Sequence, residues 1–283
     1  MQTVLVAGAT GYLGNYVVKS FKKRGYRVRV LARDAKQLRD LKGFYDDVFI
    51  GQVTQPATLR DCCKNIDVVF SSIGITRQKD KVTYLDVDYQ GNANLLKEAI
   101  KSGAHKFISV SVLNAHKMAK LKIVEAKLAF SRELIDSGID YAIIYPNGFF
   151  SDMVEILEMA KRGRGYFFGY GKYRANPIHG KDLADFCVDV VNSTDKEFEV
   201  GGPDIMTHNE MYALACEVAG VEVKTMNIPN WVKSTALFFT RKFTSSRMYG
   251  PLEFFMTVMS MDMIGKQVGK HHLKDFFIQK NFQ

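Results

Sequence analysis

Three glycines, Gly8, Gly11 and Gly14, follow an apolar run that begins almost at the first residue of the chain. An amphipathic helical pattern starts directly after them and ends in a cationic turn at residues 22–25, and a second apolar run covers residues 28–32. A strand, a glycine-rich turn, a helix and a second strand in this order form the first βαβ unit of a dinucleotide-binding fold. The spacing therefore predicts a chain built around a dinucleotide site.

Each glycine has a physical role in such a turn. Gly8 permits the tight turn out of the strand, Gly11 lets the backbone approach a pyrophosphate, and Gly14 lets the helix pack close to the strand. The free N–H groups and the positive dipole end of the helix then attract the phosphates. The alternative is a turn that binds nothing, but the flanking strand and helix favour a ligand. We predict that the whole turn contacts the pyrophosphate, including Thr10, Tyr12 and Leu13.

Strands continue to alternate with helices as far as residue 150, which predicts a Rossmann-type α/β fold with a doubly wound parallel sheet. The alternation weakens over residues 151–283, where we expect a smaller α+β cap that carries the substrate region and packs on the 1–150 core as one compact unit. Ligands of such sheets lie beyond the carboxyl ends of the strands. Besides the glycine turn, the segments expected there are Arg33, Gln52, Val53, Ser72, Ile73, Gly74, Ser111, Pro146, Asn147, Gly148 and Phe149.

Arg33 indicates which dinucleotide is bound. Proteins that bind NAD usually place a carboxylate at the end of the second strand, where it accepts from the ribose 2′-hydroxyl. Arg33 instead offers a planar cation that suits a 2′-phosphate, although Asp34 follows it directly. The sequence therefore favours NADP over NAD.

Bulk composition excludes several classes of protein. No apolar run approaches the ~18 residues of a membrane-spanning helix, and residues 2–7 are typical of a core strand rather than a leader peptide, so we expect a cytoplasmic protein. The net charge is +9, but the cations are scattered without interleaved aromatic residues, which argues against nucleic acid. The cysteines and histidines show no metal-ligand spacing, so no metal site is predicted.

Further motifs extend the glycine turn into a family pattern. They are Asp67-Val68-Val69-Phe70, Asp88-Tyr89-x-Gly91-Asn92-x-Asn94, Tyr145-Pro146-Asn147-Gly148-Phe149, Pro177-Ile178-His179 and Gly201-Gly202-Pro203. With them, residues 1 to about 228 resemble the NmrA-like proteins of the atypical, or extended, short-chain dehydrogenase/reductase superfamily. The resemblance implies NAD(P) binding in the groove described above. Tyr145 stands where many relatives carry arginine, at the floor of the cofactor and substrate pocket.

The resemblance also assigns candidate catalytic residues. The superfamily uses a serine, a tyrosine and a lysine, of which Ser111 and Lys127 occupy the first and last positions. Ile123 occupies the tyrosine position, four residues before Lys127. Isoleucine cannot transfer a proton, so the usual alcohol–ketone mechanism is not expected. Lys127, which would also hold the cofactor ribose, is the predicted proton donor, while Ser111 either orients the substrate or only ends a strand.

Two functions follow from these features. The first is an NAD(P)H-dependent reductase of a small hydrophobic acceptor, such as a quinone or an activated C=C or C=O bond. The second is an NADP(H)-binding regulatory, redox-sensing or assembly protein with little or no turnover. Apolar helices near residues 231–243 and 251–261 would line a substrate pocket, close the core of the cap, or form a subunit contact. Neighbouring cations would also suit a peripheral membrane contact, and the sequence leaves monomer and homodimer open.

Overall fold

The structure is a computed structural model that describes residues 1–76, 78 and 82–282. The chain divides into two compact units, of which the first contains Met1–Tyr145 and Leu183–Phe198, and the second contains Pro146–Asp182 and Glu199–Gln283. The division differs from a single boundary near residue 150, because the chain returns to the first unit after the second has begun. Two hydrogen bonds secure the returning segment: Ser20 Oγ donates to Asp185, and Lys106 Nζ to the carbonyl oxygen of Val191.

The sheet confirms the predicted Rossmann-type fold. Its strand order is β12-β9-β6-β5-β4-β1-β2-β3, and the strand pairs with a defined register in it are parallel. The bounds are β1 Thr3–Ala7, β2 Arg27–Ala32, β3 Asp47–Ile50, β4 Val68–Ser71, β5 Lys106–Val110, β6 Asp140–Pro146, β9 Glu197–Gly201 and β12 Lys266–Gln267. The order reverses between β1 and β4, which is the topological switch point where such sheets bind their ligands.

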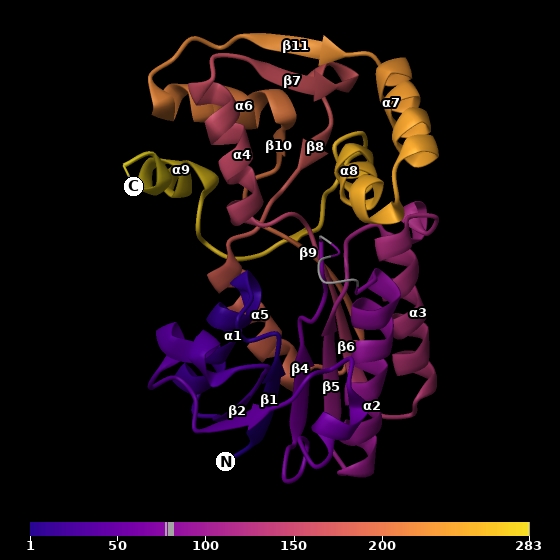
Figure 1. Cartoon of the computed structure of the whole chain (residues 1–283). Coiled ribbons are helices and arrows are strands. Elements are labelled where there is room, and N and C mark those ends of the chain that lie inside the picture. The colour runs from indigo at the N-terminus through magenta and orange to yellow at the C-terminus, as the bar shows by residue number, and fades with distance from the viewer. Residues whose placement is uncertain (77, 79–81, 283) are drawn as a thin grey trace. The chain divides into compact units, whose positions relative to one another are not determined.

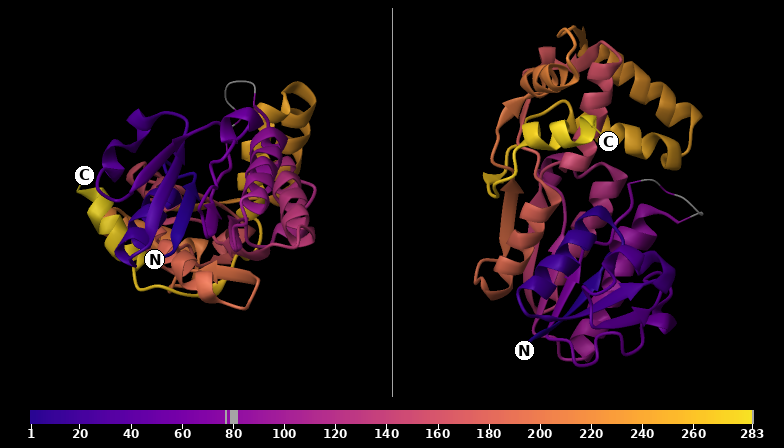
Figure 2. Two further views of the ribbon diagram at one scale, coloured as in Figure 1. Left: turned by 90° about the horizontal axis from the view of Figure 1, so that it is seen from below. Right: turned by 90° about the vertical axis from the view of Figure 1, so that its left-hand side faces the viewer.

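Helices cover both faces of the sheet in the first unit (Figure 1). They are α1 Tyr12–Lys23, α2 Asn92–Lys101, α3 Lys122–Asp136 and α5 Gly180–Asp189, with short 3-10 turns at Ala35–Leu41, Pro56–Leu59 and Ala115–Met118. The views in Figure 2 show the strands enclosed between these helical layers. The buried core of this unit includes Leu5, Val69, Leu95, Phe107 and Phe130.

Two helical segments differ from the periodicity of the sequence. The helical spacing of apolar residues predicts one helix over about residues 83–102, but its first part, Leu85–Gly91, is a π-helix that leads into α2. Pro56 as a helix start likewise predicts a helix to Lys64, but only Pro56–Leu59 forms, as a 3-10 turn. Asp61 and Asn65 take positive φ angles of 64° and 59°, which no right-handed helix accommodates.

The second unit has its own core. It contains α4 Phe150–Lys161, β7 Gly165–Phe168, β8 Arg174–Ala175, β10 Met206–Thr207, α6 His208–Ala219, β11 Thr225–Ile228, α7 Asn230–Phe243, α8 Ser246–Val258 and α9 Leu273–Asn281. Phe150, Leu157, Tyr212 and Phe277 are fully or almost fully buried within it. Thr207 begins α6 with the predicted capping box, in which its hydroxyl accepts from Glu210 N–H and the Glu210 carboxylate accepts from Thr207 N–H. Among the described residues no helix is both long and apolar enough to cross a bilayer.

Buried His208 makes the stability of this unit sensitive to acid. Burial lowers the pKa of its imidazole to about 4, against 6.5 in the unfolded chain. The folded state therefore favours the neutral ring, and stability is lost as the pH falls from about 6.5 towards 4. Urea unfolding should show that acidification from about pH 7.5 to 5 costs on the order of 2 kcal/mol through this residue. His208→Phe should remove that loss and His116→Gln, at an exposed position, should retain it; equal acid sensitivity in all three would contradict the assignment.

Candidate active site

The turn between β1 and α1 has the geometry of a phosphate site. Gly8 adopts a φ of 87°, and Gly11 N–H donates to the Gly8 carbonyl oxygen at 2.9 Å, which closes the turn. A Cβ atom at Gly14 would lie 2.0 Å from the same oxygen, so only glycine fits where the helix meets the turn. The N-cap residue of α1, Gly11, has no side chain that could cap the helix, and the first turn of α1 holds no acidic residue. The positive end of the helix dipole is thus left for an anion.

The end of β4 lies beside this turn. The Ser72 N–H donates to the carbonyl oxygen of Ala7 at 3.1 Å. A Cβ atom at Gly8 would lie 2.7 Å from Ser72 Oγ, so the two strand ends approach as closely as their backbones allow. Ile73 is partly buried against the core, and Gly74 is exposed. The structure therefore brings the predicted Ser72–Gly74 segment to the glycine turn.

At the end of β2, two neighbouring charges have separate roles. The Asp34 carboxylate accepts from Lys36 N–H at 2.9 Å and caps the following 3-10 turn. Arg33 is exposed, and among the described residues no hydrogen bond or ion pair engages its guanidinium. The carboxylate is thus committed to the backbone, while the cation remains open to an anionic ligand.

Gln52 and Val53 lie after β3, as expected for the adenine side of the site. Gln52 N–H donates to Thr58 Oγ1 at 2.8 Å, and the Val53 carbonyl oxygen accepts from Asn94 Nδ2 at 2.9 Å. Asn94 thereby ties the α2 helix to this loop. A Cβ atom at Gly91 would lie 2.9 Å from a Val53 methyl group, which explains the glycine inside the helical segment.

Lys127 forms a buried ion pair that the sequence did not reveal. Its Nζ lies 2.9 Å from Asp88 Oδ1; the Asp88 side chain is fully buried, and that of Lys127 is 18% exposed. Asp88 Oδ2 also accepts from Ile75 N–H at 3.1 Å. A Cβ atom at Gly74 would lie 2.7 Å from Asp88 Oδ1 and 2.9 Å from Lys127 Nζ, so the end of β4 leaves room for both charged groups. The structure therefore places Lys127 at the predicted strand end.

The π-helix positions Asp88. Asn92 Nδ2 donates to the Asp88 carbonyl oxygen at 2.9 Å, and Ser71 Oγ donates to Asn92 Oδ1, which fastens the wide turn to the end of β4. Burial raises the pKa of the Asp88 carboxyl above its usual value, while the Lys127 charge and the Ile75 N–H act in the opposite direction. A buried carboxyl group with a raised pKa thus lies beside an ammonium group at the strand ends, as is common at functional sites.

Ser111 follows β5, and its backbone N–H donates to the carbonyl oxygen of Ile144 at 2.8 Å. Its hydroxyl is buried and has no hydrogen-bond partner among the described residues. A buried hydroxyl normally finds a partner, because leaving one unsatisfied costs about 1–3 kcal/mol. A bound ligand could supply the hydrogen-bond partner that the Ser111 hydroxyl lacks among the described residues.

The position of the usual tyrosine is filled by a core residue. Ile123 is 6% exposed and lies in the first turn of α3. Tyr145 does not replace the missing phenol, because its hydroxyl donates to Glu197 Oε2 at 2.7 Å. Lys127 and Asp88 are charged side chains that the first unit brings to Gly74.

Residues Pro146–Phe149 belong to the second unit. The Asn147 amide donates to Asn176 Oδ1 at 3.1 Å, and Gly148 N–H donates to Asn147 Oδ1 at 2.6 Å. Phe149 N–H donates to Asp152 at the start of α4. These bonds shape the turn after β6; contact of Tyr145–Phe149 with the cofactor stays a prediction.

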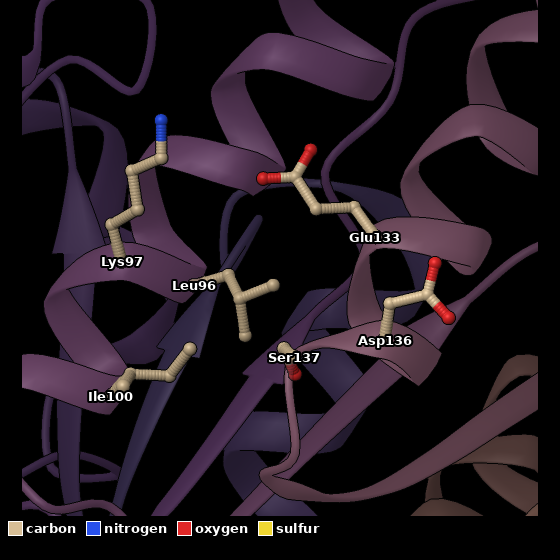
Figure 3. A pocket seen from close by; sticks show the side chains of 6 residues that line it. All are labelled: Leu96, Lys97, Ile100, Glu133, Asp136 and Ser137. Carbon is tan, nitrogen blue, oxygen red and sulfur yellow. The ribbon is translucent and has the colours of Figure 1, made fainter.

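A surface hollow between α2 and α3 lies apart from the residues described above (Figure 3). Its lining comes from the C-terminal turns of the two helices and includes Lys97, Glu133 and Ser137. In a parallel α/β unit these helix ends lie at the amino edge of the sheet, opposite the ligand edge. The hollow is therefore separate from the residues around Gly74.

Asp88 is the functional candidate that sequence reasoning missed as an individual residue. In the sequence, Asp88 stands out only as the first residue of the family motif Asp88-Tyr89-x-Gly91-Asn92-x-Asn94. The available signal was a carboxylate four residues before Asn92, a spacing that places the two side chains on one face of a helix. Its pairing with Lys127 depends on two helices that approach each other in the fold, which local spacing does not encode.

Known proteins share this sequence pattern. Residues 8–194 match the model of the NAD(P)H-binding family. The chain is 30% identical to the divinyl chlorophyllide a 8-vinyl-reductase of Cucumis sativus, over 95% of this chain and 71% of that protein. It is 32% identical to the Arabidopsis thaliana enzyme of the same name, over 80% of this chain and 60% of that protein. It is also 27% identical to the photosystem II assembly factor Ycf39 of Synechocystis, over 85% and 74%.

Solved structures share the fold. The NADPH-dependent quinone oxidoreductase of Escherichia coli, in complex with NADPH, superposes with a TM-score of 0.77 at 18% identity and covers all of both chains. The triphenylmethane reductase of Citrobacter, in complex with NADP(H), gives 0.76 at 15% identity over 99% and 100% of the chains. Together with the matched family model, the fold and the glycine turn show that this chain belongs to the NAD(P)H-binding family of NmrA-like, atypical short-chain dehydrogenase/reductase proteins.

Proposed function

We propose that this chain is an NADPH-dependent reductase of a hydrophobic acceptor with an activated C=C bond, in which Lys127 supplies the proton. The observation that carries the proposal is the Lys127–Asp88 ion pair at Gly74, beside a strand end that approaches the glycine turn. A protein that only holds the dinucleotide needs no proton donor at this place, whereas a reductase does. The pair therefore favours turnover over cofactor holding alone.

The residues present fit the cofactor. The uncapped N-terminus of α1 and the glycines that allow close approach would hold the pyrophosphate. Arg33 would engage a 2′-phosphate, because its guanidinium is exposed while Asp34 caps a backbone turn. Gln52 and Val53 would border the adenine. NADPH, when bound, supplies a hydride.

Side chains of this protein would supply the proton and orient the acceptor. Lys127 holds a proton on Nζ, and its partial exposure lets water replace a proton that has been transferred. Asp88 holds the Lys127 ammonium group at 2.9 Å, beside Gly74. The Ser111 hydroxyl is available to orient the acceptor or the nicotinamide amide. Reduction of a C=C bond then balances as one hydride and one proton added to adjacent carbons, with NADP⁺ released.

The relatives favour this acceptor class. The plant relatives are named as reductases of a vinyl group, which is a C=C bond, on divinyl chlorophyllide a. Ile123 removes the phenol that a ketone reductase would use, and a C=C reduction needs only one proton donor at carbon. We therefore name divinyl chlorophyllide a as the test substrate, called the vinyl acceptor below.

NADPH oxidation in the presence of the vinyl acceptor tests the proposal. We expect NADPH consumption to match the loss of vinyl groups one to one, measured by absorbance and by mass of the product. A simple quinone serves as the comparison acceptor. Saturable NADPH binding without consumption of either acceptor would instead favour an assembly role of the kind named for the Synechocystis relative.

A further inference from the structure

One face of α7 exposes a row of large aromatic side chains. Trp231, Phe238, Phe239 and Phe243 are 69%, 60%, 52% and 70% exposed, and we call them the aromatic face of α7. Trp231 and Phe238 lie two helical turns apart, and Phe239 and Phe243 one turn apart, so each pair shares a side of the helix. Leu237 is 7% exposed and points the opposite way, which shows that the helix already has an inward face.

The charges around this face have one sign. Residues 223–252 contain no aspartate or glutamate. Their cations are Lys224, Lys233, Arg241, Lys242 and Arg247. On the two sides of this stretch, Glu222 pairs with Lys224 at 3.0 Å, and Glu253 is buried and pairs with Arg241, which joins α7 to α8. The outer surface of α7 is therefore aromatic and cationic.

Lys242 lies within the face itself. Its Nζ is 5.9 Å from the centroid of the Phe238 ring and 5.8 Å from that of Phe243. Phe239 and Phe243 stack at 6.1 Å with an interplanar angle of 11°. An ammonium group above exposed rings suits a boundary where an apolar layer meets anionic groups.

We propose that the aromatic face of α7 docks on an anionic lipid bilayer. Exposed rings gain by burial in the acyl boundary, and lysine and arginine gain by contact with lipid phosphates. α7 has 14 residues, which suits a helix lying in the interface plane. A second copy that docks through the same face would need acidic residues opposite these cations, and α7 has none. Such docking would bring the protein to hydrophobic molecules dissolved in the membrane.

The single tryptophan of the chain reports directly on this face. The full-length protein is mixed with vesicles of phosphatidylcholine alone or with added phosphatidylglycerol. We expect the Trp231 emission to shift to shorter wavelength only with the anionic vesicles, and brominated acyl chains to quench it. High salt should weaken the binding, because part of the attraction is electrostatic.

Matched variants identify the surface. Phe239→Ser with Phe243→Ser should weaken vesicle binding about tenfold or more, because each lost phenylalanine removes buried apolar area. Lys242→Glu should abolish the preference for anionic lipid. Phe282→Ser, at an exposed phenylalanine beyond α9, should bind like the wild type. NADPH affinity, unchanged in all three, shows that the chains are folded.

Three results would overturn the proposal. The first is unchanged Trp231 emission in the presence of anionic vesicles. The second is a dimer, seen by sedimentation, that Phe239→Ser with Phe243→Ser converts to a monomer, which would make the face a contact between copies. The third is a Trp231 response to the vinyl acceptor without vesicles, which would make it part of a substrate pocket. None of these depends on whether the chain turns over NADPH.

Discussion

Replacement of Lys127 by methionine is expected to lower the rate of acceptor reduction by at least about 100-fold. It should also lower the free energy of unfolding by about 3–5 kcal/mol, because the buried Asp88 carboxylate loses its partner. Burial already raises the pKa of the Asp88 carboxyl, and loss of the Lys127 charge removes an effect that lowers this pKa. A raised folded-state pKa costs stability as the pH rises above the value in the unfolded chain, so this loss should be smallest in acid. Urea unfolding across pH and steady-state rates measure the two effects.

A second substitution separates stability from chemistry. Adding Asp88→Asn to Lys127→Met removes the unpaired charge, so most of the stability should return while the reduction rate stays low. Lys122→Met alters a lysine of the same helix whose ion pair with Glu125 is exposed, and it should change both quantities little. Recovery of the rate in the double variant would show that Lys127 only balances a buried charge.

Replacement of Arg33 by serine is expected to weaken NADPH binding about 10- to 100-fold while leaving NADH binding nearly unchanged. The expected loss corresponds to about 1.5–3 kcal/mol for a charge-assisted hydrogen bond to phosphate. Asp34 should not repel the 2′-phosphate strongly, since its carboxylate caps Lys36 N–H. Fluorescence titration with both nucleotides measures the affinities.

Arg27 provides the matched control for this experiment. It is an exposed arginine at the amino end of the same strand, whereas Arg33 follows the carboxyl end. Arg27→Ser should therefore leave both affinities unchanged. Equal loss of NADPH and NADH affinity in Arg33→Ser would point to a general charge effect, and wild-type preference for NADH would refute the NADP assignment.

The fold and the phosphate turn were predictable because their causes are local. The spacing of Gly8, Gly11 and Gly14 reflects contacts within one turn, and the structure shows the steric reason for Gly14 directly. The place of Arg33 after the second strand was also predictable, because it depends only on where that strand ends, and its contact with a 2′-phosphate stays a prediction. The structure adds that Asp34 is occupied as a cap, which the sequence left open.

Only one residue of the Lys127–Asp88 ion pair was predictable from the sequence. Lys127 was found through the family pattern, but Asp88 required the approach of α3 and the π-helix in three dimensions. The π-helix itself has no periodic signature, since the sequence continues from it into the ordinary helical spacing of α2. Likewise, the sequence allowed several roles for the aromatic residues of α7. Only their exposure in the structure shows that they form an outer face of the helix and are not part of a core.

Transfer of a deuterium label tests the central claim most directly. NADPH that carries deuterium on the transferred position of the nicotinamide is incubated with the wild-type chain and the vinyl acceptor, and the product is analysed by mass spectrometry. The account predicts one deuterium in each reduced ethyl group and a loss of at least about 100-fold in labelled product with Lys127→Met. Bound NADPH together with an unlabelled, unreduced acceptor would contradict it.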